Sequence, residues 1–421
     1  MQNTCLQAGA GKCDIHFPDD FFPTEGYTGV HDELKIRLIL LECGNKIAIV
    51  SIELTSIPDE FIQTFQQFIA ECTETNPENV LVFVSHTFSA PHFVPEKFCK
   101  SSADKKKNNC LLKYIKKAIL NASIQAKTNM QPAHFGYATG ICNINVNRDF
   151  LTPAGWWLGS NDSGPSDKTV SVFRFDTFDG KPIAMLYCYS VQPSVLDGLH
   201  KAGEPYLISA DLTGVSSSFL EQEYNNEIVA LFCLGAAGDQ SPSFKIFSQY
   251  IDSNGHIQTL NYQAYGYAIA EMLGNRLGIE VLQVSKTINC QAVHSDILIE
   301  RTLLKCPGQV LPRDTHSIRP TTQYEYQQAE DREESIVMFK IGEIALIGVR
   351  PELSCSTAEI IKRQSPIPMT TICTMVNGAA KYMPEQSAYD RITYEAMNSP
   401  FGRGSAELLC EKVLELLRNQ V

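Results

Sequence analysis

Val80-Leu81-Val82-Phe83-Val84 runs directly into the polar turn Ser85-His86-Thr87. A run of five apolar residues that ends so abruptly is typical of a strand buried on both faces in an α/β protein. Loops that follow such strands are where a sheet presents its chemistry to a cleft. The imidazole of His86 is suited there to bind a metal ion or to act as a general base. The alternative is a satisfied core or capping histidine.

The rest of the chain alternates strand-like and helix-like segments. Residues 34–41 and 46–52 are predicted to form a hairpin, and residues 58–72 an amphipathic helix. Residues 101–109 hold three consecutive lysines and are expected to be a solvated loop. The pattern predicts one large mixed α/β domain over residues 1–421, with a small β-rich insertion near 284–332. The other expected strands are 170–175, 182–191, 228–234, 335–340, 343–349 and 371–376, and the other expected helices are 111–128, 209–224, 262–277, 351–363 and 406–419.

Composition narrows the class of protein. Apolar residues make up 44% of the 421 residues and charged residues 19%, so the chain can bury a large core and is not disordered. Its 35 basic and 47 acidic side chains give a formal charge of −12, which disfavours non-specific binding to nucleic acid or anionic lipid. A neutral lipid offers no net charge to repel, so lipid-like substrates stay open.

The cysteines do not suggest a disulfide framework. Fourteen of them are scattered between Cys5 and Cys410, and no Cys-x-x-Cys pair occurs. The N-terminus lacks the basic and apolar regions of a signal peptide, and no apolar run approaches the ~20 residues that span a bilayer. We therefore expect reduced thiols in a cytoplasmic protein without a transmembrane segment.

A second polar motif, Asn145-Val146-Asn147-Arg148, is expected as a turn at another strand end. A single arginine among asparagines suits the recognition of a carboxylate, a phosphate or an oxyanion. An ordinary asparagine-rich turn is the alternative.

A third motif follows the predicted strand 228–234 and covers residues 235–242. Its small residues would let the backbone approach a ligand closely, and Asp239 and Ser241 lie on the turn. Ser241 could act as a nucleophile or donate to an oxyanion. The motif is neither a nucleophile elbow nor a phosphate loop. A glycine-rich connection with a capping residue is the alternative.

The fourth motif, Arg350-Pro351-Glu352-Leu353, follows the predicted strand 343–349. The carboxylate of Glu352 could bind a metal ion or act as a base. The alternative is a carboxylate at a helix N-terminus, where the helix dipole favours it.

Taken in chain order, these motifs resemble the N-terminal catalytic region of the neutral/alkaline, non-lysosomal ceramidase family. The resemblance covers residues 8–412 and implies an αββα-like layered sandwich, in which mixed sheets are flanked by helices. We expect no counterpart of the C-terminal immunoglobulin-like domain of long members. The similar stretches are residues 8–15, 85–91, 145–148, 170–193, 209–211 and 238–242, together with Asn377, Tyr382, Tyr389 and Tyr394-Glu395.

The resemblance implies hydrolysis of an amide by water that a zinc ion activates. His86, Glu352 and Tyr382 correspond to metal ligands of the family. Arg148 would stabilise the oxyanion, and Ser241 falls on a serine with a catalytic role. We assign Asn147, Asp239 and Gln192 to substrate binding.

Two positions depart from the family pattern. Phe88 replaces the second histidine of the His-Thr-His motif and removes a possible proton shuttle. Gln192 replaces the histidine of a His-Pro dipeptide, which is a metal ligand in the family, and glutamine is a weak ligand for zinc. His92 and His200 flank the altered motifs and are candidates to compensate.

Three functions remain open at this stage. The leading hypothesis is a zinc-dependent hydrolase of an amide bond in an N-acylated, ceramide-like lipid. The second is a degenerate relative that binds such a ligand without metal catalysis, which the residues Phe88 and Gln192 suggest. The third is a serine-centred hydrolase that uses Ser241 with His86 as its base. In the first two hypotheses, the expected partner is an acyl amide. We do not expect nucleic acid as a partner, and the sequence does not indicate an oligomeric state.

Overall fold

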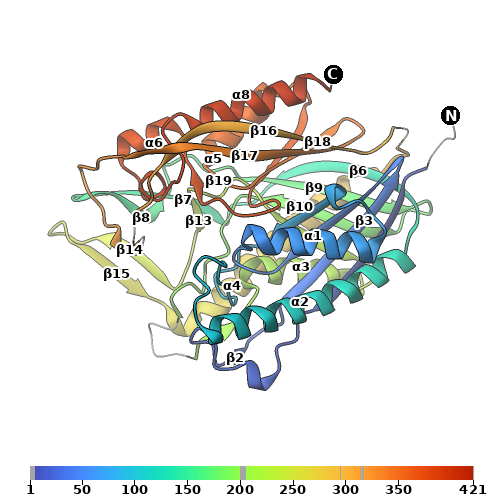
Figure 1. The fold of residues 1–421 in the computed structure, drawn as a ribbon, viewed down its shortest axis with the longest axis horizontal. Helices are drawn as coiled ribbons and strands as arrows, with labels where there is room; N and C mark the ends of the chain where they lie inside the picture. The colour runs from blue at the N-terminus through green and yellow to red at the C-terminus, as the bar shows by residue number, and fades with distance from the viewer. Residues whose placement is uncertain (1–4, 200–204, 294, 313, 315–316, 421) are drawn as a thin grey trace.

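The computed structural model describes residues 5–199, 205–293, 295–312, 314 and 317–420, and it stacks two sheets between layers of helices (Figure 1). The predicted α/β class and the helix, sheet, sheet, helix layering are confirmed. Helices α1, α2, α3 and α4 cover the outer face of the larger sheet, and helices α5 and α8 cover the outer face of the smaller one (Figure 1).

The larger sheet has eight strands in the order β12-β10-β9-β6-β1-β3-β4-β5. The pairs β10–β12 and β4–β5 are parallel, and the other neighbours are antiparallel. Its strands are β1 (Gln7–Asp14), β3 (Lys35–Cys43), β4 (Asn45–Ile52), β5 (Val80–Val84), β6 (Gln131–Ile141), β9 (Thr169–Thr177), β10 (Pro182–Tyr189) and β12 (Val229–Leu234).

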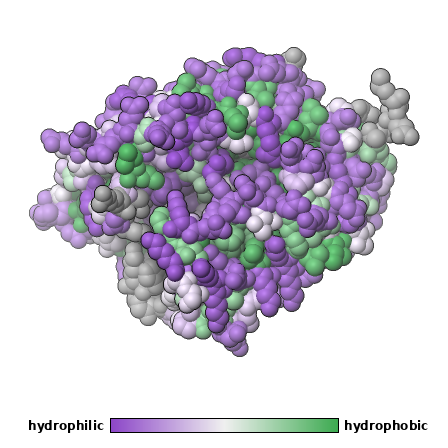
Figure 2. All heavy atoms as spheres, viewed as in Figure 1, coloured by the Kyte–Doolittle hydropathy of each residue, from purple (hydrophilic) through white to green (hydrophobic). Residues whose placement is uncertain are grey.

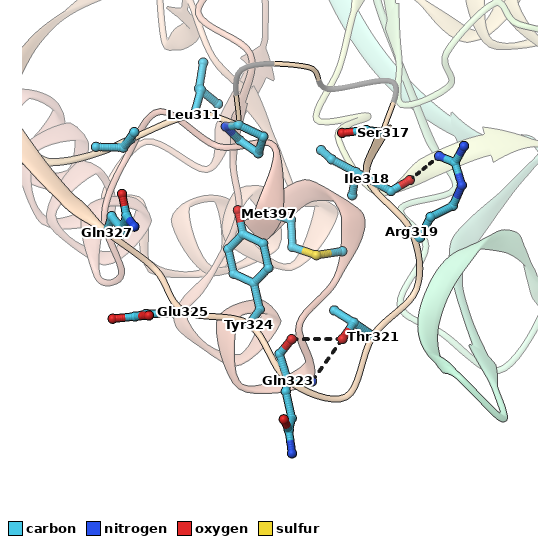
Figure 3. Close-up of a pocket in the computed structure, with 12 residues that line it drawn as sticks. Leu311, Ser317, Ile318, Arg319, Thr321, Gln323, Tyr324, Glu325, Gln327 and Met397 are labelled. Atoms are coloured by element: carbon cyan, nitrogen blue, oxygen red, sulfur yellow. Dashed lines mark hydrogen bonds between the residues drawn. The ribbon is translucent and has the colours of Figure 1, made fainter.

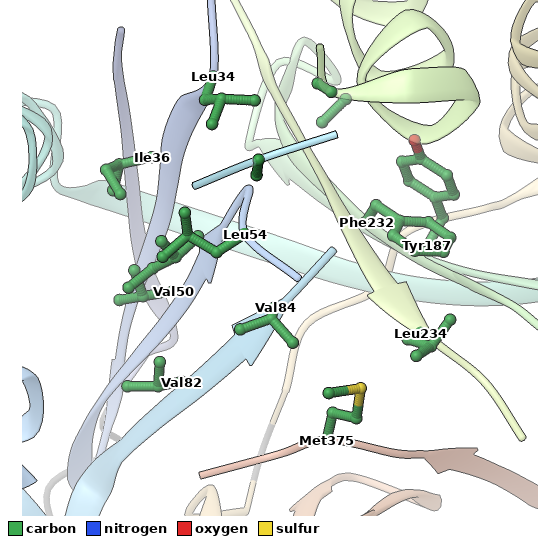
Figure 4. Packing of buried hydrophobic residues seen from close by; sticks show 14 of the residues in the cluster. Leu34, Ile36, Val50, Leu54, Val82, Val84, Tyr187, Phe232, Leu234 and Met375 are labelled. Atoms are coloured by element: carbon green, nitrogen blue, oxygen red, sulfur yellow. The ribbon is translucent and has the colours of Figure 1, made fainter. Parts of the chain in front are cut away.

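Central strands of this sheet are apolar on both faces because both faces are covered. In β5, Val80, Val82 and Val84 pack toward the helices, whereas Leu81 and Phe83 pack toward the second sheet. The same period of two runs through β3 and β4. Figure 4 shows the helix-side core, in which Val82 and Val84 lie near Leu54 and Met375.

The smaller sheet has four strands in the order β16-β17-β18-β20, of which only the pair β18–β20 is parallel. Alternate residues of β17 again face opposite cores: Val337 and Phe339 face the larger sheet, and Ile336 and Met338 face α5 and α8. We call the layer between the two sheets the inter-sheet core. The elements are β16 (Leu298–Gln309), β17 (Gln328–Ile341), β18 (Ile344–Val349), β20 (Met369–Cys373), α5 (Cys355–Gln364) and α8 (Ser405–Arg418).

Four helices cover the larger sheet: α1 (Asp59–Thr73), α2 (Ser102–Thr128), α3 (Asp211–Glu223) and α4 (Gly266–Thr287). The prediction of a loop over residues 101–109 is wrong, because Ser101 and Asp104 form a capping box that starts α2 there. Helix α2 packs directly on β1. A side-chain carbon on Gly11 would lie 2.1 Å from the carbonyl oxygen of Ala122, so this position needs glycine.

Residues 284–332 do not form a separate β-rich insertion. Helix α4 continues to Thr287, and β16 is an edge strand of the four-stranded sheet, with Leu304 and Cys306 in its helix-side core. The apolar positions in β16 are sparse because one of its faces is exposed, and for this reason the segment looks like a separate unit in the sequence.

Smaller elements surround the ends of the two sheets. The motif 145–148 belongs to strand β7 rather than to a turn, because β7 pairs with β8 and β13 in a sheet of three strands. These elements are β2 (Gly29–Val30), β7 (Asn145–Thr152), β8 (Gly155–Asn161), β11 (Leu207–Ile208), β13 (Gln240–Pro242), β14 (Phe247–Ile251), β15 (Ile257–Asn261), β19 (Glu352–Leu353), β21 (Tyr382–Met383), α6 (Gln386–Arg391) and α7 (Tyr394–Met397), with 3-10 turns at Asp19–Phe21, Pro77–Asn79 and Gln263–Tyr265.

One crossing segment, residues 374–377, ties the two sheets together. The N–H of Thr374 donates to the carbonyl of Leu234 in β12, and that of Val376 donates to Val349 in β18. The N–H of Asn377 donates to Val82 in β5 at 2.8 Å. This segment therefore fixes β5, β12 and β18 relative to one another.

Three further observations concern the surface, the thiols and the helices. The face in Figure 2 is mainly hydrophilic, with scattered apolar side chains. All fourteen cysteines are free thiols. Among the described residues, no helix combines the length and the apolar character that crossing a membrane requires. The single-domain organisation and the cytoplasmic location stay predictions of the sequence.

We predict that Phe339→Ala lowers the free energy of unfolding by about 3–5 kcal/mol, because Phe339 is 1% exposed in the inter-sheet core and the change leaves a cavity. Phe178, which is 57% exposed, provides the control: Phe178→Ala should cost less than about 1 kcal/mol. Urea unfolding of both variants measures this. Equal costs for the two would contradict the two-sheet packing.

Candidate functional site

A cavity of about 520 Å³ lies where β5 and β18 end, and both His86 and Glu352 line it. Four of its other lining residues are cationic, and most of the rest are apolar. The complete lining is Ser56, Ile57, Pro58, Asp59, Glu60, His86, Pro95, Lys97, Phe98, Leu311, Arg332, Arg350, Glu352, Met375, Ala379, Ala380, Lys381 and Pro400.

His86 follows β5 in a left-handed backbone conformation, with φ of 66°. Its Nδ1 lies 2.6 Å from the carbonyl oxygen of Thr55. A carbonyl oxygen only accepts hydrogen bonds, so Nδ1 carries a hydrogen and the ring orientation is fixed. The buried Nε2 has no hydrogen-bond partner and lies 3.4 Å from Oε2 of Glu352. This nitrogen is the free functional atom of the ring.

Glu352 is held beside Tyr382, because the short strands β19 and β21 pair in parallel at these two residues. The carboxylate is 5% exposed. Burial by itself raises the pKa of Glu352, but the positive charges of His86 and Arg148 and the hydrogen bond from Gln192 lower it overall. Glu352 is therefore ionised near neutral pH and able to accept a proton.

Gln192 lies just beyond β10 and bridges Glu352 to Arg148. Its Oε1 accepts a hydrogen bond from Arg148 Nη1 at 2.6 Å, and its Nε2 donates to Glu352 Oε2 at 2.6 Å. The direction of the amide is forced, because a guanidinium only donates and a carboxylate without a proton only accepts. The oxygen of Gln192 therefore points away from the space between His86 and Glu352.

Arg148 lies in β7, fully inside the protein, and is held by more than one partner. Its Nε donates to Oε1 of Glu395 at 2.6 Å, and its guanidinium lies 5.2 Å from the ring centre of Tyr382 and 5.8 Å from that of Tyr394. Arg148 is thus one link in a series of hydrogen bonds that runs from Glu395 through Arg148 and Gln192 to Glu352. In this arrangement Arg148 orients Gln192 rather than projecting freely into the cavity.

Tyr382 is a buried phenol beside this charged chain. Burial and the negative charge of Glu352 raise its pKa well above the usual value for tyrosine. The phenol is therefore neutral, and a neutral phenol is a poor metal ligand.

Asn147 and Asp239 lie next to the site and hold its frame. Asn147 Nδ2 donates to Asp239 Oδ2 at 3.1 Å, and the N–H of Cys355 donates to Asp239 Oδ1 at 2.8 Å. The backbone of Arg148 donates to the carbonyl of Asp239 at 2.9 Å. The polar atoms predicted to bind substrate thus connect β7, the end of β12 and α5.

The glycine-rich turn 235–242 approaches protein backbone rather than open space. A side-chain carbon on Gly238 would lie 3.0 Å from the carbonyl oxygen of Glu352, and the N–H of Gly238 donates to Leu353. Ser241 is 2% exposed, and its hydroxyl donates to the adjacent carbonyl of Pro242 at 3.3 Å. The structure therefore does not bring Ser241 into hydrogen-bond contact with His86, which the serine-centred hypothesis requires.

The positions that depart from the family pattern are not compensated by His92. Phe88 packs its ring against the edge of His86, with ring centres 4.9 Å apart. His92 instead contacts Oε2 of Glu25 at 2.7 Å, with 44% of its side chain exposed. His200 lies outside the described residues.

The side chains present do not make a zinc site in this arrangement. Among the described residues, no group of three or more His, Cys, Asp and Glu side chains is placed to hold a metal ion. His86 and Glu352 supply two donors. Gln192 presents an N–H rather than its oxygen, and Tyr382 is a neutral phenol.

Several residues of the site escaped the sequence-based prediction. Glu395 partners Arg148, the carbonyl of Thr55 orients His86, and Met375 and Lys381 line the cavity. Like His86, the last two adopt left-handed conformations, with φ of 55° and 57°. Such strain costs about 1–3 kcal/mol per residue and gathers at functional sites. Of these residues, only Glu395 could have been found from the sequence, because it belongs to the block Tyr394-Glu395 that resembles the family.

A second cavity of about 660 Å³ lies beyond Leu311, which lines both (Figure 3). Figure 3 shows Tyr324 and Met397 side by side in it, with Arg319 at one side. None of the predicted site residues lines this cavity.

The fold and the site together define an αββα sandwich with a carboxylate and an imidazole facing each other at strand ends. The structure is similar to the neutral ceramidase of Pseudomonas aeruginosa, with a TM-score of 0.75 at 16% identity over 99% of this chain and 75% of that one. It is also similar to a ceramidase complexed with C2, with a TM-score of 0.76 at 17% identity over 99% and 76% of the two chains. No protein-family model and no curated protein matches the sequence. The chain therefore has the neutral ceramidase fold, as its motifs predicted.

We predict a pH-dependent stability difference between the protein and Asp239→Asn. Burial raises the pKa of Asp239 to about 7, whereas an unfolded aspartate has a pKa of about 3.9. The folded protein therefore holds the proton more tightly, and this stabilisation is lost as pH rises from about 4 to about 7. The unfolding free energy of the variant minus that of the wild type should increase by up to roughly 1.4 kcal/mol per pH unit over that range.

Asp179→Asn is the control, because hydrogen bonds from Thr177 and Lys181 lower the pKa of this exposed carboxylate. The unfolding free energy of Asp179→Asn minus that of the wild type should decrease slightly as the pH rises, which is opposite in sign to the change for Asp239→Asn. Denaturant unfolding between pH 4 and pH 7.5 measures both slopes, and a flat difference for Asp239→Asn would contradict the assignment.

Proposed function

We propose that this protein hydrolyses a linear amide bond in an N-acylated, lipid-like substrate. The observation that carries the proposal is the pairing of His86 Nε2 and Glu352 in one cavity whose other walls are largely apolar. The fold, shared with ceramidases, supports the same class of substrate. The apolar walls would take the acyl chain, and the pair would face the amide.

The chemistry follows from the fixed orientations of three side chains. Glu352, ionised by its neighbours, takes a proton from water as the water oxygen attacks the amide carbon. Gln192, whose amide nitrogen donates to Glu352, holds this carboxylate in position during the attack. The proton then passes to the leaving nitrogen by way of Glu352 and His86, the carbon–nitrogen bond breaks, and a carboxylic acid and an amine leave.

A second candidate function is ligand binding without catalysis. It is favoured by the hydrogen-bonded series from Glu395 through Arg148 and Gln192 to Glu352, which stabilises the site and turns the nitrogen of Gln192, rather than its oxygen, toward Glu352. Phe88, in place of an imidazole, adds to that argument. The assay below separates the two candidates.

We predict that the purified protein releases fatty acid from a set of N-acyl amides, measured by mass spectrometry, and that Glu352→Gln lowers the rate at least ~100-fold because it removes the base. Glu343→Gln, in the exposed turn between β17 and β18, is the matched control and should leave the rate unchanged. Binding of the amides without any release would instead establish the second candidate.

We also predict that Gln192→His creates a zinc site. The substitution supplies a second imidazole beside His86 and Glu352 and removes the amide that occupies Glu352. Elemental analysis should find stoichiometric zinc in this variant and substoichiometric zinc in the wild type and in the control Gln192→Leu. Stoichiometric zinc in the wild type would refute the orientation assigned to Gln192.

A further inference from the structure

The cavity that holds His86 and Glu352 is rich in positive charge. Its cationic lining residues are Lys97, Arg332, Arg350 and Lys381, and its anionic ones are Asp59, Glu60 and Glu352. The whole chain carries a formal charge of −12. A cationic cavity in an acidic protein therefore requires an explanation.

Pairing accounts for part of this charge. Arg350 Nη2 forms an ion pair with Asp59 Oδ2 at 2.6 Å, and Glu352 is engaged by Gln192 and His86. Glu60 accepts a hydrogen bond from the backbone N–H of Glu96 at 2.8 Å. The anionic side chains of the cavity are thus committed to partners.

Three cations remain over. Among the described residues, Lys97, Arg332 and Lys381 have no carboxylate within 4.0 Å. Lys97 lies 5.0 Å above the ring of Phe98, and Arg332 lies 5.4 Å from the ring centre of Phe401. Lys381 contacts the neutral amide oxygen of Asn398 at 3.3 Å.

The position of Lys381 links this charge to the reacting group. The N–H of Glu352 donates to the carbonyl of Lys381 at 2.8 Å, which fixes Lys381 beside the carboxylate. Its left-handed backbone, with φ of 57°, is a conformation that lysine adopts only at a cost. A substituent on the nitrogen side of the substrate amide would therefore lie near the positive charge of Lys381.

The remaining walls suit an acyl chain. Ile57, Pro58, Leu311 and Met375 are apolar, and Phe98 is 61% exposed at the edge of the cavity. Leu311 also lines the second cavity, which Figure 3 shows. The cavity thus combines an apolar part with a cationic part.

We propose that the substrate is an N-acyl amino acid, whose carboxylate is bound by Lys381 and Arg332, rather than an uncharged N-acyl amino alcohol. The proposal rests on the proposed function for the place of the amide. Opposite charges at short range select the anionic ligand, and the positive field of these exposed side chains also attracts it from solution. Lys97 contributes to that attraction from the edge.

The test compares N-dodecanoylglycine with N-dodecanoylethanolamine, which share the acyl chain and the amide but differ in charge. We expect the wild type to favour the glycine compound at least tenfold in kcat/KM. Lys381→Met and Arg332→Met should each lower that preference and kcat/KM for the glycine compound several-fold. Lys105→Met, on helix α2 outside the cavity, is the control and should change neither. The ratio of the two substrates in one sample does not depend on how much of a variant folds.

The outcomes separate this proposal from the function on which it rests. Hydrolysis of both compounds at equal kcat/KM, or a ratio that neither variant changes, overturns the substrate class and leaves the hydrolase standing. If neither compound is hydrolysed, the hydrolase proposal fails, and isothermal titration of the wild type with both compounds decides the selectivity. The selectivity is supported if the dissociation constant of the glycine compound is at least tenfold lower than that of the ethanolamine compound and if this difference shrinks at high salt. Equal affinities, or a higher affinity for the ethanolamine compound, overturn it.

Discussion

Burial of the strands on both faces is the constraint on which the structure depends. The larger sheet packs against helices on one side and against a second sheet on the other, so β5 and β18 cannot carry polar side chains along their length. Polar groups therefore collect where the strands end. His86 and Glu352 occupy two such ends, and the site exists because the layers leave it no other place.

Within the site, one chain of hydrogen bonds decides what each group can do. Arg148 is a donor only, and this makes the Gln192 amide turn its oxygen toward the arginine and its nitrogen toward Glu352. Arg148 thus sets which end of the Gln192 amide faces Glu352. The free atom that results is Nε2 of His86, since Thr55 already holds Nδ1.

The sequence predicted the layers and the strand ends, because both follow from patterns of apolar residues that repeat locally. It singled out His86 and Glu352, which lie far apart in the chain and close together in the structure. It did not predict that Arg148 lies within a strand, since the partners of β7 come from distant segments. The direction of the Gln192 amide and the left-handed conformation of Lys381 likewise depend on tertiary neighbours and leave no local pattern. The start of helix α2 does leave a local pattern, because Ser101 and Asp104 form a capping box. The three lysines that follow led instead to the prediction of a loop.

The crossing segment 374–377 has a consequence for how the molecule assembles. It joins β5 and β12 of the larger sheet to β18 of the smaller one, so residues near the end of the chain complete the contact between the two halves of the cavity. Most of the larger sheet can form while the later residues are still being synthesised, but its inner face then lacks the cover of β17 and β18. The cavity closes last, through contacts of long sequence separation that are slow to form. Function is thereby coupled to completion of the fold: a chain interrupted before residue 374 contains His86, Gln192 and Glu352 but lacks Lys381 and Tyr382, whose backbone holds Glu352 in place.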